Sequence, residues 1–331
     1  VLAYFGWPVA HEDEAERAIR AGLAVRDAVG QLSGGEALLA CRIGVATGLV
    51  VVGELIGQGT ASDQTVVGDT PNLAARLQAL AEPGQLVIGE TTRQLLGDLF
   101  KLEALEPQLL KGLDGPVSAF AVTGEQTLES RFAARGAGAI LPMEGRDQEL
   151  ALLLERWSLA KAGEGQGVLL VGEAGIGKSR ITEALIDALS PEPHTRIRYQ
   201  CSPYHSDSAL WPVIQQLGHA ASFSAAEPLE ARLDKVEALL AAAGQGTDAA
   251  PFFAELLGLD GSARYGRQEL SPQAKRARTL EALTNQLAGL ARRQPVLLLI
   301  EDAHWADPTT LELVELWLDA TAAAPVLLVL T

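Results

Sequence analysis

The segment after the apolar run at residues 168–171 constrains the fold more than any other part of this chain. It sets glycines, a lysine and a serine at fixed spacing: Gly172, Glu173, Ala174, Gly175, Ile176, Gly177, Lys178 and Ser179. Glycines let a loop wrap its backbone N–H groups around phosphate oxygens, and the helix N-terminus that follows adds partial positive charge. Lys178 would reach the outer phosphates and the Ser179 hydroxyl would bind Mg²⁺. The pattern predicts a strand, a phosphate-binding loop and a helix, with ATP or GTP as the ligand.

A second apolar run, at residues 296–300, ends in the two carboxylates Glu301 and Asp302. Two acids at the end of a buried strand are unfavourable unless a cation lies near them. We expect this strand one strand over from the phosphate loop, where the acids would hold Mg²⁺ and orient an attacking water. Glu301 stands where the metal-ordering acid is usual, and Asp302 where the water-activating acid is usual. The sequence leaves open which of the two contacts the metal.

Composition excludes several classes of protein. Lys and Arg number 26 against 42 Asp and Glu, and the net charge of −16 disfavours nucleic acid as a partner. Cys41 and Cys201 form no Cys-x-x-Cys pattern, so we expect neither a disulfide framework nor a zinc site, but a reducing, cytoplasmic setting. The apolar stretch at residues 316–330 is broken by Asp319 and Pro325 and is too short to span a membrane.

Hydrophobic periodicity predicts two α/β regions. In the first, we expect helices at residues 12–29, 70–81 and 91–99, and strands at 1–5, 41–46, 49–52, 85–88, near 102 and at 119–122. In the second, we expect helices at 148–161 and 179–189, a mostly helical span at 209–293, and strands at 168–171, 195–200, 296–300 and 326–330. The runs at 41–46 and 49–52 have the pattern of neighbouring strands. Leu229, Leu233, Val236 and Leu240 form one apolar helix stripe that we expect to face the core.

The stretch at residues 125–143 loses periodicity and is rich in Gly and Ala, which is typical of a linker. We therefore predict domains at 1–124 and 144–331. The chain begins and ends inside apolar runs, and we expect it to be part of a longer polypeptide.

Asn72 and Arg76 lie four positions apart, so on a helix they share one face, while Leu73, Leu77 and Leu80 line a neighbouring one. An amide beside a guanidinium could hold a ribose and a phosphate. From spacing alone, however, a polar surface pair is the simpler interpretation. The same holds for His205 and His304, which could contact phosphate or metal but are more simply loop histidines.

The second region resembles the STAND branch of AAA-type P-loop ATPases. The resemblance rests on residues 144–150, 172–179, 201–205, 271–276 and 301–307. It implies a P-loop NTPase domain with a parallel sheet and a long helical insertion, in which Arg146 also contacts the nucleotide. ATP would act as a conformational switch, often ahead of a helical-repeat sensor. The family's sensor arginine would follow Thr331.

The first region resembles class III nucleotidyl cyclases, through residues 42–48, 65–77 and 110–114. The resemblance implies a ferredoxin-like α+β domain that dimerises and converts ATP to cyclic AMP and pyrophosphate with two Mg²⁺ or Mn²⁺ ions. Asn72 would position the ribose, Arg76 would stabilise phosphate charge, and Thr65 would read the purine as in adenylate-forming members. The family's metal-binding aspartates and purine-reading lysine would precede Tyr4, so we expect the chain alone not to form cyclic AMP.

The leading hypothesis is a cytoplasmic signalling protein in which an adenylate cyclase domain is regulated by an ATP-binding P-loop domain. A second hypothesis is that the cyclase-like domain is degenerate and serves only to dimerise a nucleotide-switched scaffold. A third is a STAND-type transcription regulator with its DNA-binding domain beyond Thr331.

Overall fold

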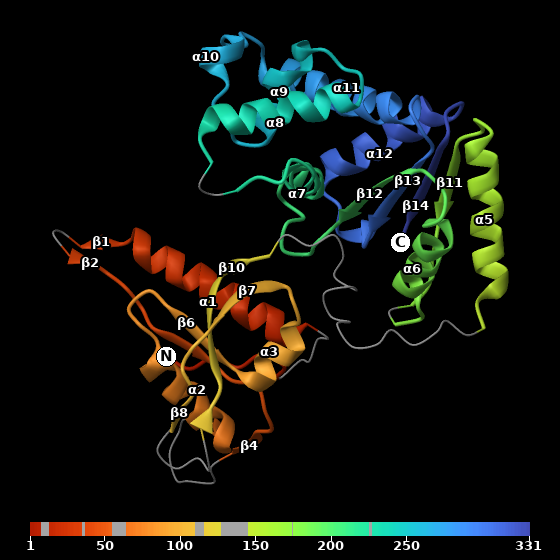
Figure 1. Ribbon diagram of the computed structural model, residues 1–331. Helices are drawn as coiled ribbons and strands as arrows, with labels where there is room; N and C mark the ends of the chain where they lie inside the picture. Colours follow the sequence, from red (N-terminus) through yellow and green to blue (C-terminus); the bar gives the residue numbers. More distant parts are fainter. Residues whose placement is uncertain are drawn as a thin grey trace. The chain divides into compact units, whose positions relative to one another are not determined.

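The computed structural model describes residues 1–7, 13–34, 37–54, 64–109, 116–126, 145–173, 175–224 and 227–331. The chain folds into two compact units, Val1–Ile140 and Leu141–Thr331. The first runs from red to yellow and the second from green to blue in Figure 1. The predicted linker falls outside the described residues from residue 127 on. The predicted domain boundaries at 124 and 144 stay predictions.

The first unit has a mixed four-stranded sheet in the order β3-β6-β10-β7. Its elements are α1 (Glu14–Gln31), β1 (Ser33–Gly34), β2 (Ala37–Leu38), β3 (Ile43–Val45), β4 (Val51–Glu54), β5 (Gln64–Val67), α2 (Asp69–Leu80), β6 (Leu86–Gly89), α3 (Glu90–Leu96), β7 (Phe100–Ala104), β8 (Gln108–Leu109), β9 (Pro116–Val117) and β10 (Ala119–Glu125). Strand β3 is parallel to β6, whereas β10 is antiparallel to both β6 and β7. The predicted helices and the α/β class are confirmed.

Alternation along β6 places one core on each face of this sheet. Leu86 and Ile88 pack in a cluster with Ile19 of α1 and Leu96 of α3. Val87, between them in the chain, packs instead with Leu77 of α2. All of these side chains are buried. Helix α2 therefore lies on the face of the sheet opposite α1 and α3.

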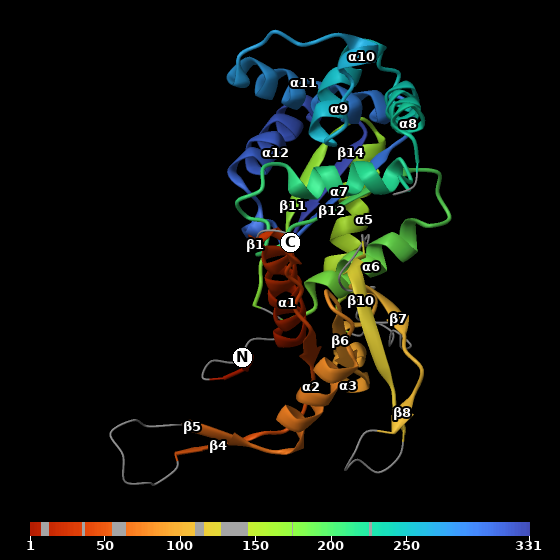
Figure 2. The ribbon, with the colours of Figure 1, turned by 90° about the vertical axis from the view of Figure 1, so that its left-hand side faces the viewer.

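Two strand predictions in this unit are wrong. The runs at 41–46 and 49–52 do not pair, because β3 aligns with the buried β6 while β4 forms a separate antiparallel ribbon with β5. Figure 2 shows this ribbon extending away from α2. Residues 1–5 form no strand, and their side chains are exposed. An apolar run becomes a strand only where another strand takes up its backbone hydrogen bonds.

The second unit has a parallel sheet in the order β11-β14-β13-β12. Its elements are α5 (Asp147–Lys161), β11 (Gln166–Leu169), α6 (Lys178–Leu189), β12 (Thr195–Gln200), α7 (Trp211–Ala220), α8 (Leu229–Ala242), the 3-10 turn η1 (Thr247–Ala249), α9 (Ala250–Leu256), α10 (Ser262–Tyr265), α11 (Pro272–Ala291), β13 (Val296–Glu301), the 3-10 turn η2 (Ala303–Trp305), α12 (Pro308–Thr321) and β14 (Val326–Leu330). The helical insertion is confirmed, since α7 to α11 lie between β12 and β13.

Helices cover both faces of the parallel sheet, so β13 is buried along its whole length. Leu297 and Leu299 pack with α5 and α6, whereas Leu298 and Ile300 pack with the helices of the insertion and α12. Because strand side chains alternate, Glu301 falls on the same face as Leu297 and Leu299. The sheet therefore presents Glu301 to α6.

Three predictions in this unit need correction. Strand β11 ends at Leu169 rather than at Val171. Its last hydrogen bond to β14 runs from the Leu170 N–H to the Leu330 carbonyl. The acidic strand β13 is not next to β11, because β14 lies between them. Leu229 begins α8 and is exposed, so the core stripe starts at Leu233. No helix among the described residues is both long and apolar enough to cross a membrane.

Candidate nucleotide-binding site

The predicted phosphate loop connects β11 to the first residue of α6. Gly175 and Gly177 have φ values of 78° and 104°, which L side chains rarely adopt. A Cβ on Gly172 would lie 2.9 Å from the Ile176 side chain. Ala174 lies outside the described residues. Backbone conformation thus favours glycine at positions 175 and 177, and contact with the Ile176 side chain favours it at position 172.

Two cations lie against this loop. The Lys178 Nζ donates to the carbonyls of Gly172 and Glu173, at 2.9 and 3.0 Å. Arg146, directly before α5, donates to the Ile176 carbonyl at 3.3 Å and to the Glu149 carboxylate at 2.7 Å. The structure thus brings both predicted nucleotide-binding cations to the predicted loop.

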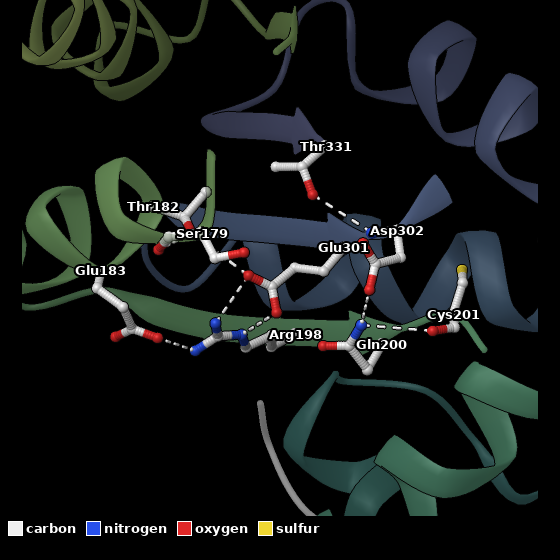
Figure 3. A network of polar contacts seen from close by, with 9 residues as sticks. All are labelled: Ser179, Thr182, Glu183, Arg198, Gln200, Cys201, Glu301, Asp302 and Thr331. Atoms are coloured by element: carbon white, nitrogen blue, oxygen red, sulfur yellow. Dashed lines mark hydrogen bonds and ion pairs between the residues drawn. The ribbon is translucent and has the colours of Figure 1, made fainter. Parts of the chain in front are cut away.

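Glu301 is 3% exposed, and its carboxylate accepts hydrogen bonds from two elements. Arg198 of β12 donates two hydrogen bonds to this carboxylate, from Nε to Oε2 at 3.0 Å and from Nη2 to Oε1 at 2.8 Å. The Thr182 hydroxyl of α6 lies 3.3 Å from Oε1 and 2.8 Å from the Ser179 carbonyl. Figure 3 shows these side chains converging at the end of β13. Thr182 thus connects the acid to the turn that carries Ser179.

Arg198 also donates to Glu183 of α6, from Nη1 at 2.7 Å (Figure 3). Burial opposes the charge on Arg198, but its bonds to Glu301 and Glu183 outweigh this and raise its pKa. Burial raises the pKa of Glu301, against the opposing pull of Arg198. The guanidinium is therefore a fixed positive charge shared by two carboxylates.

Asp302 has a left-handed backbone, with φ at 53°. Its Oδ2 accepts from Gln200 Nε2 of β12 at 2.8 Å, and its N–H lies 3.3 Å from the Thr331 hydroxyl. A residue other than glycine in this region is strained, and such strain clusters at functional sites. Contacts from β12 and from Thr331 hold Asp302 in this conformation.

In the first unit, Asn72 and Arg76 lie on α2 as predicted. Asn72 is exposed and donates to the Gly68 carbonyl at 3.5 Å, while Arg76 is half-buried. Thr65 lies in β5, and its side chain falls outside the described part of the chain, as do residues 110–114. Helix α2 lies so close to β3 that a Cβ on Gly44 would collide with its backbone. The sheet therefore fixes the helix that carries both residues.

A cavity of about 300 Å³ lies beside α2. Leu73 lines it together with Thr47 and Thr92, whose hydroxyls are 2.9 Å apart. Asn72 and Arg76 do not line it, so this cavity is not the site that the sequence predicts.

Residues 143–329 match the family described as AAA ATPase domain. This chain belongs to the AAA ATPase domain family. Residues 2–124 match the family described as adenylate and guanylate cyclase catalytic domain. The second unit is accordingly the AAA domain and the first the cyclase domain, which confirms the two resemblances at this level.

One relative spans the whole chain. It is an uncharacterised protein of Rhizobium meliloti (strain 1021), 32% identical over 333 residues, and the match covers 100% of this chain but 32% of the relative. The chain thus spans about a third of the length of that relative.

Solved cyclase structures match part of the chain. The guanylate cyclase domain of Catenaria anguillulae, in complex with GTP, is 27% identical, with 37% of this chain and 66% of that chain covered and a TM-score of 0.34. The adenylyl cyclase CyaB of P. aeruginosa is 28% identical. The match covers 37% of this chain and 66% of that chain, with a TM-score of 0.34.

The donors at the AAA site suit Mg²⁺. The Ser179 hydroxyl and the carboxylates of Glu301 and Asp302 supply the hard oxygen ligands that this ion prefers. Arg198 engages both oxygens of Glu301, and this acid could act on a metal through a bound water. Mg²⁺ usually keeps water and phosphate ligands, which fits such a site.

Sequence reasoning missed Thr182, Glu183, Arg198 and Gln200 as partners of the AAA site. A signal was present in β12, where Arg198 and Gln200 alternate with the buried Ile197 and Tyr199. Polar residues at every second position of a strand whose other face is buried indicate that the polar face meets other polar groups. His205 stacks on Trp211, with ring centroids 4.1 Å apart, which suits a structural role.

Proposed function

We propose that this chain is part of a signalling protein in which a nucleotide cyclase domain is regulated by an ATP-binding AAA domain. The observation that carries the proposal is the convergence of Lys178, Arg146 and the phosphate loop at the N-terminus of α6, in a chain that also matches the cyclase family. Cationic side chains and free helix N–H groups together suit a polyphosphate.

In the AAA domain, we assign ATP as the ligand. Lys178 would exchange its two loop carbonyls for phosphate oxygens, and Ser179 and Glu301 would hold Mg²⁺, which neutralises phosphate charge when bound. Asp302, whose carboxylate accepts a hydrogen bond from Gln200, would orient an attacking water. We propose that this domain is of the STAND type, with bound ATP acting as a conformational switch.

In the cyclase domain, we propose conversion of ATP to cyclic AMP and pyrophosphate by a homodimer. Asn72 would orient the ribose, and Arg76 would stabilise the negative charge that develops on the phosphates. Thr65 supports adenine over guanine by the family resemblance. The two catalytic metal ions, Mg²⁺ or Mn²⁺, would be held by aspartates of the full-length protein.

The test supplies ATP and GTP together, with Mg²⁺ or Mn²⁺, to the full-length protein and measures both cyclic products. Cyclic AMP should predominate, and Arg76→Ala should lower its formation on the order of 100-fold or more, because the lost guanidinium acts in the transition state. The matched control is Arg26→Ala, since Arg26 of α1 pairs at 2.8 Å with its neighbour Asp27. If cyclic GMP predominated, the assignment of ATP as the cyclase substrate would be wrong. If neither product formed, the cyclase assignment itself would be wrong.

A dimerisation module without catalysis is the second candidate. Leu49 and Val51 of the cyclase domain are 96% and 71% exposed, which is unusual for large apolar side chains and favours a protein interface. This candidate predicts that Arg76→Ala leaves signalling output unchanged while Lys178→Ala abolishes it. A cytoplasmic location and a downstream helical-repeat sensor stay predictions.

A further inference from the structure

Arg198 is the centre of a buried ion cluster in the AAA domain. All three guanidinium nitrogens are engaged, Nε and Nη2 with Glu301 and Nη1 with Glu183. The side chain of Arg198 is 6% exposed, that of Glu301 4% and that of Glu183 17%. Charges so far removed from water interact strongly, and each depends on its partners for compensation.

The cluster joins the elements that build the phosphate site. Strand β12 is parallel to β13, with Gln200 opposite Glu301, so Arg198 and Glu301 extend from neighbouring strands toward α6. Glu183 lies on α6, about one turn beyond Ser179. Figure 3 shows the Arg198 guanidinium between the two carboxylates. Arg198 thus connects Glu301 of β13 to Glu183 of α6.

The charges in the cluster do not balance. One guanidinium faces two carboxylates, and the Asp302 carboxylate follows directly in the chain. A nucleotide triphosphate would add further negative charge next to this excess. The positive charge of Arg198 thus offsets part of the negative charge of Glu301, as a bound cation would otherwise do.

We propose that Arg198 is a positioning residue that holds Glu301 as a built-in counter-ion and thereby sets how strongly nucleotide binding depends on Mg²⁺. The proposal rests on ATP binding by the AAA domain. In the wild-type chain, the partly neutralised Glu301 repels metal-free ATP weakly. Without Arg198, Glu301 and Glu183 face the phosphates uncompensated, and only a metal ion relieves the repulsion.

The test is the ratio of the ATP dissociation constant in EDTA to that in Mg²⁺, measured with a fluorescent ATP analogue. Arg198→Gln should raise this ratio on the order of tenfold, because it removes a buried counter-charge. Arg198→Lys keeps the charge and should restore most of the wild-type ratio. Glu183→Gln leaves the pair of Arg198 and Glu301 intact and should not raise the ratio.

A second variant covers the case in which Arg198→Gln does not fold. Glu301→Gln removes the negative charge rather than its compensation, so the ATP dissociation constant in EDTA, and with it the ratio, should fall below the wild-type value. A lower melting temperature with an unchanged ratio in both variants would show a structural role and overturn the proposal for Arg198. Failure of the wild-type chain to bind ATP would overturn the proposed function of the AAA domain as well.

Discussion

The AAA domain collects its proposed site residues from several elements, whereas two of the three proposed for the cyclase domain, Asn72 and Arg76, lie on one helix. Lys178 comes from α6, Glu301 and Asp302 from the end of β13, and Arg198 from β12. Parallel strands bring their carboxyl ends to one edge of the sheet, where such side chains meet. Asn72 is instead exposed on α2. Parallel strands can thus gather charged side chains from several elements, whereas Asn72 and Arg76 are brought together by helix spacing alone.

The largest expected effect tests the AAA half of this comparison. Lys178→Ala should weaken ATP binding on the order of 100-fold, because it removes charge-assisted hydrogen bonds to phosphate. Titration with a fluorescent ATP analogue measures this. Lys161→Ala is the matched control, since Lys161 ends α5 and pairs with Glu192 at 2.7 Å. Equal losses in the two variants would show that the loop lysine has no special role.

A pair of glycine variants tests whether each unit carries its own stability. A Cβ on Gly44 would collide with the backbone of α2, and one on Gly289 of α11 with the carbonyl of Ala243. Gly44→Ala should lower the stability of the cyclase domain by about 1–3 kcal/mol, and Gly289→Ala that of the AAA domain by a similar amount.

Thermal unfolding followed with and without ATP would distinguish the two glycine variants. Gly44→Ala should leave ATP affinity in the AAA domain unchanged within about twofold, the usual outcome for independent sites. If Gly44→Ala weakened ATP binding as much as Gly289→Ala, the two units would have to be treated as one cooperative structure.

The smallest effect concerns the two cysteines, one in each unit. Cys201 is 1% exposed, and burial together with the charges of Asp302 and Asp307 raises its pKa to about 12. Because the thiolate is the reactive form, Cys201 should resist alkylation at pH 7–9, while the half-buried Cys41 reacts first. Cys41→Ser should remove the fast phase of iodoacetamide labelling, measured by mass spectrometry. A fast phase that persists would show that the AAA core opens readily.

Prediction from sequence succeeded where a segment's surroundings could be inferred from the segment itself. The run at Val326–Leu330 is apolar on both faces and became a buried interior strand. The strand and the helix predicted on either side of residues 172–177 are likewise present as β11 and α6, while phosphate binding by this loop stays a prediction. In both cases the physical cause lies within a few residues of the motif.

Prediction failed where the cause lies far away in the chain. Arg198 and Glu301 are 103 positions apart, so no local sequence pattern predicts their pairing. Strand β3 was assigned the wrong neighbour because its partner β6 follows only after an intervening ribbon and helix. Strand order likewise depends on crossovers, which is why β14 between β11 and β13 was not foreseen.

The residue after β14, Thr331, is hydrogen-bonded to the two residues that follow β13. The Thr331 hydroxyl bonds to the Asp302 N–H, and the Thr331 carbonyl accepts from the Ala303 N–H at 2.8 Å. Asp302 is held in a strained backbone conformation at the same point. A displacement of Thr331 would therefore shift the backbone of Asp302 directly, because these hydrogen bonds join the end of β14 to the residues that follow β13.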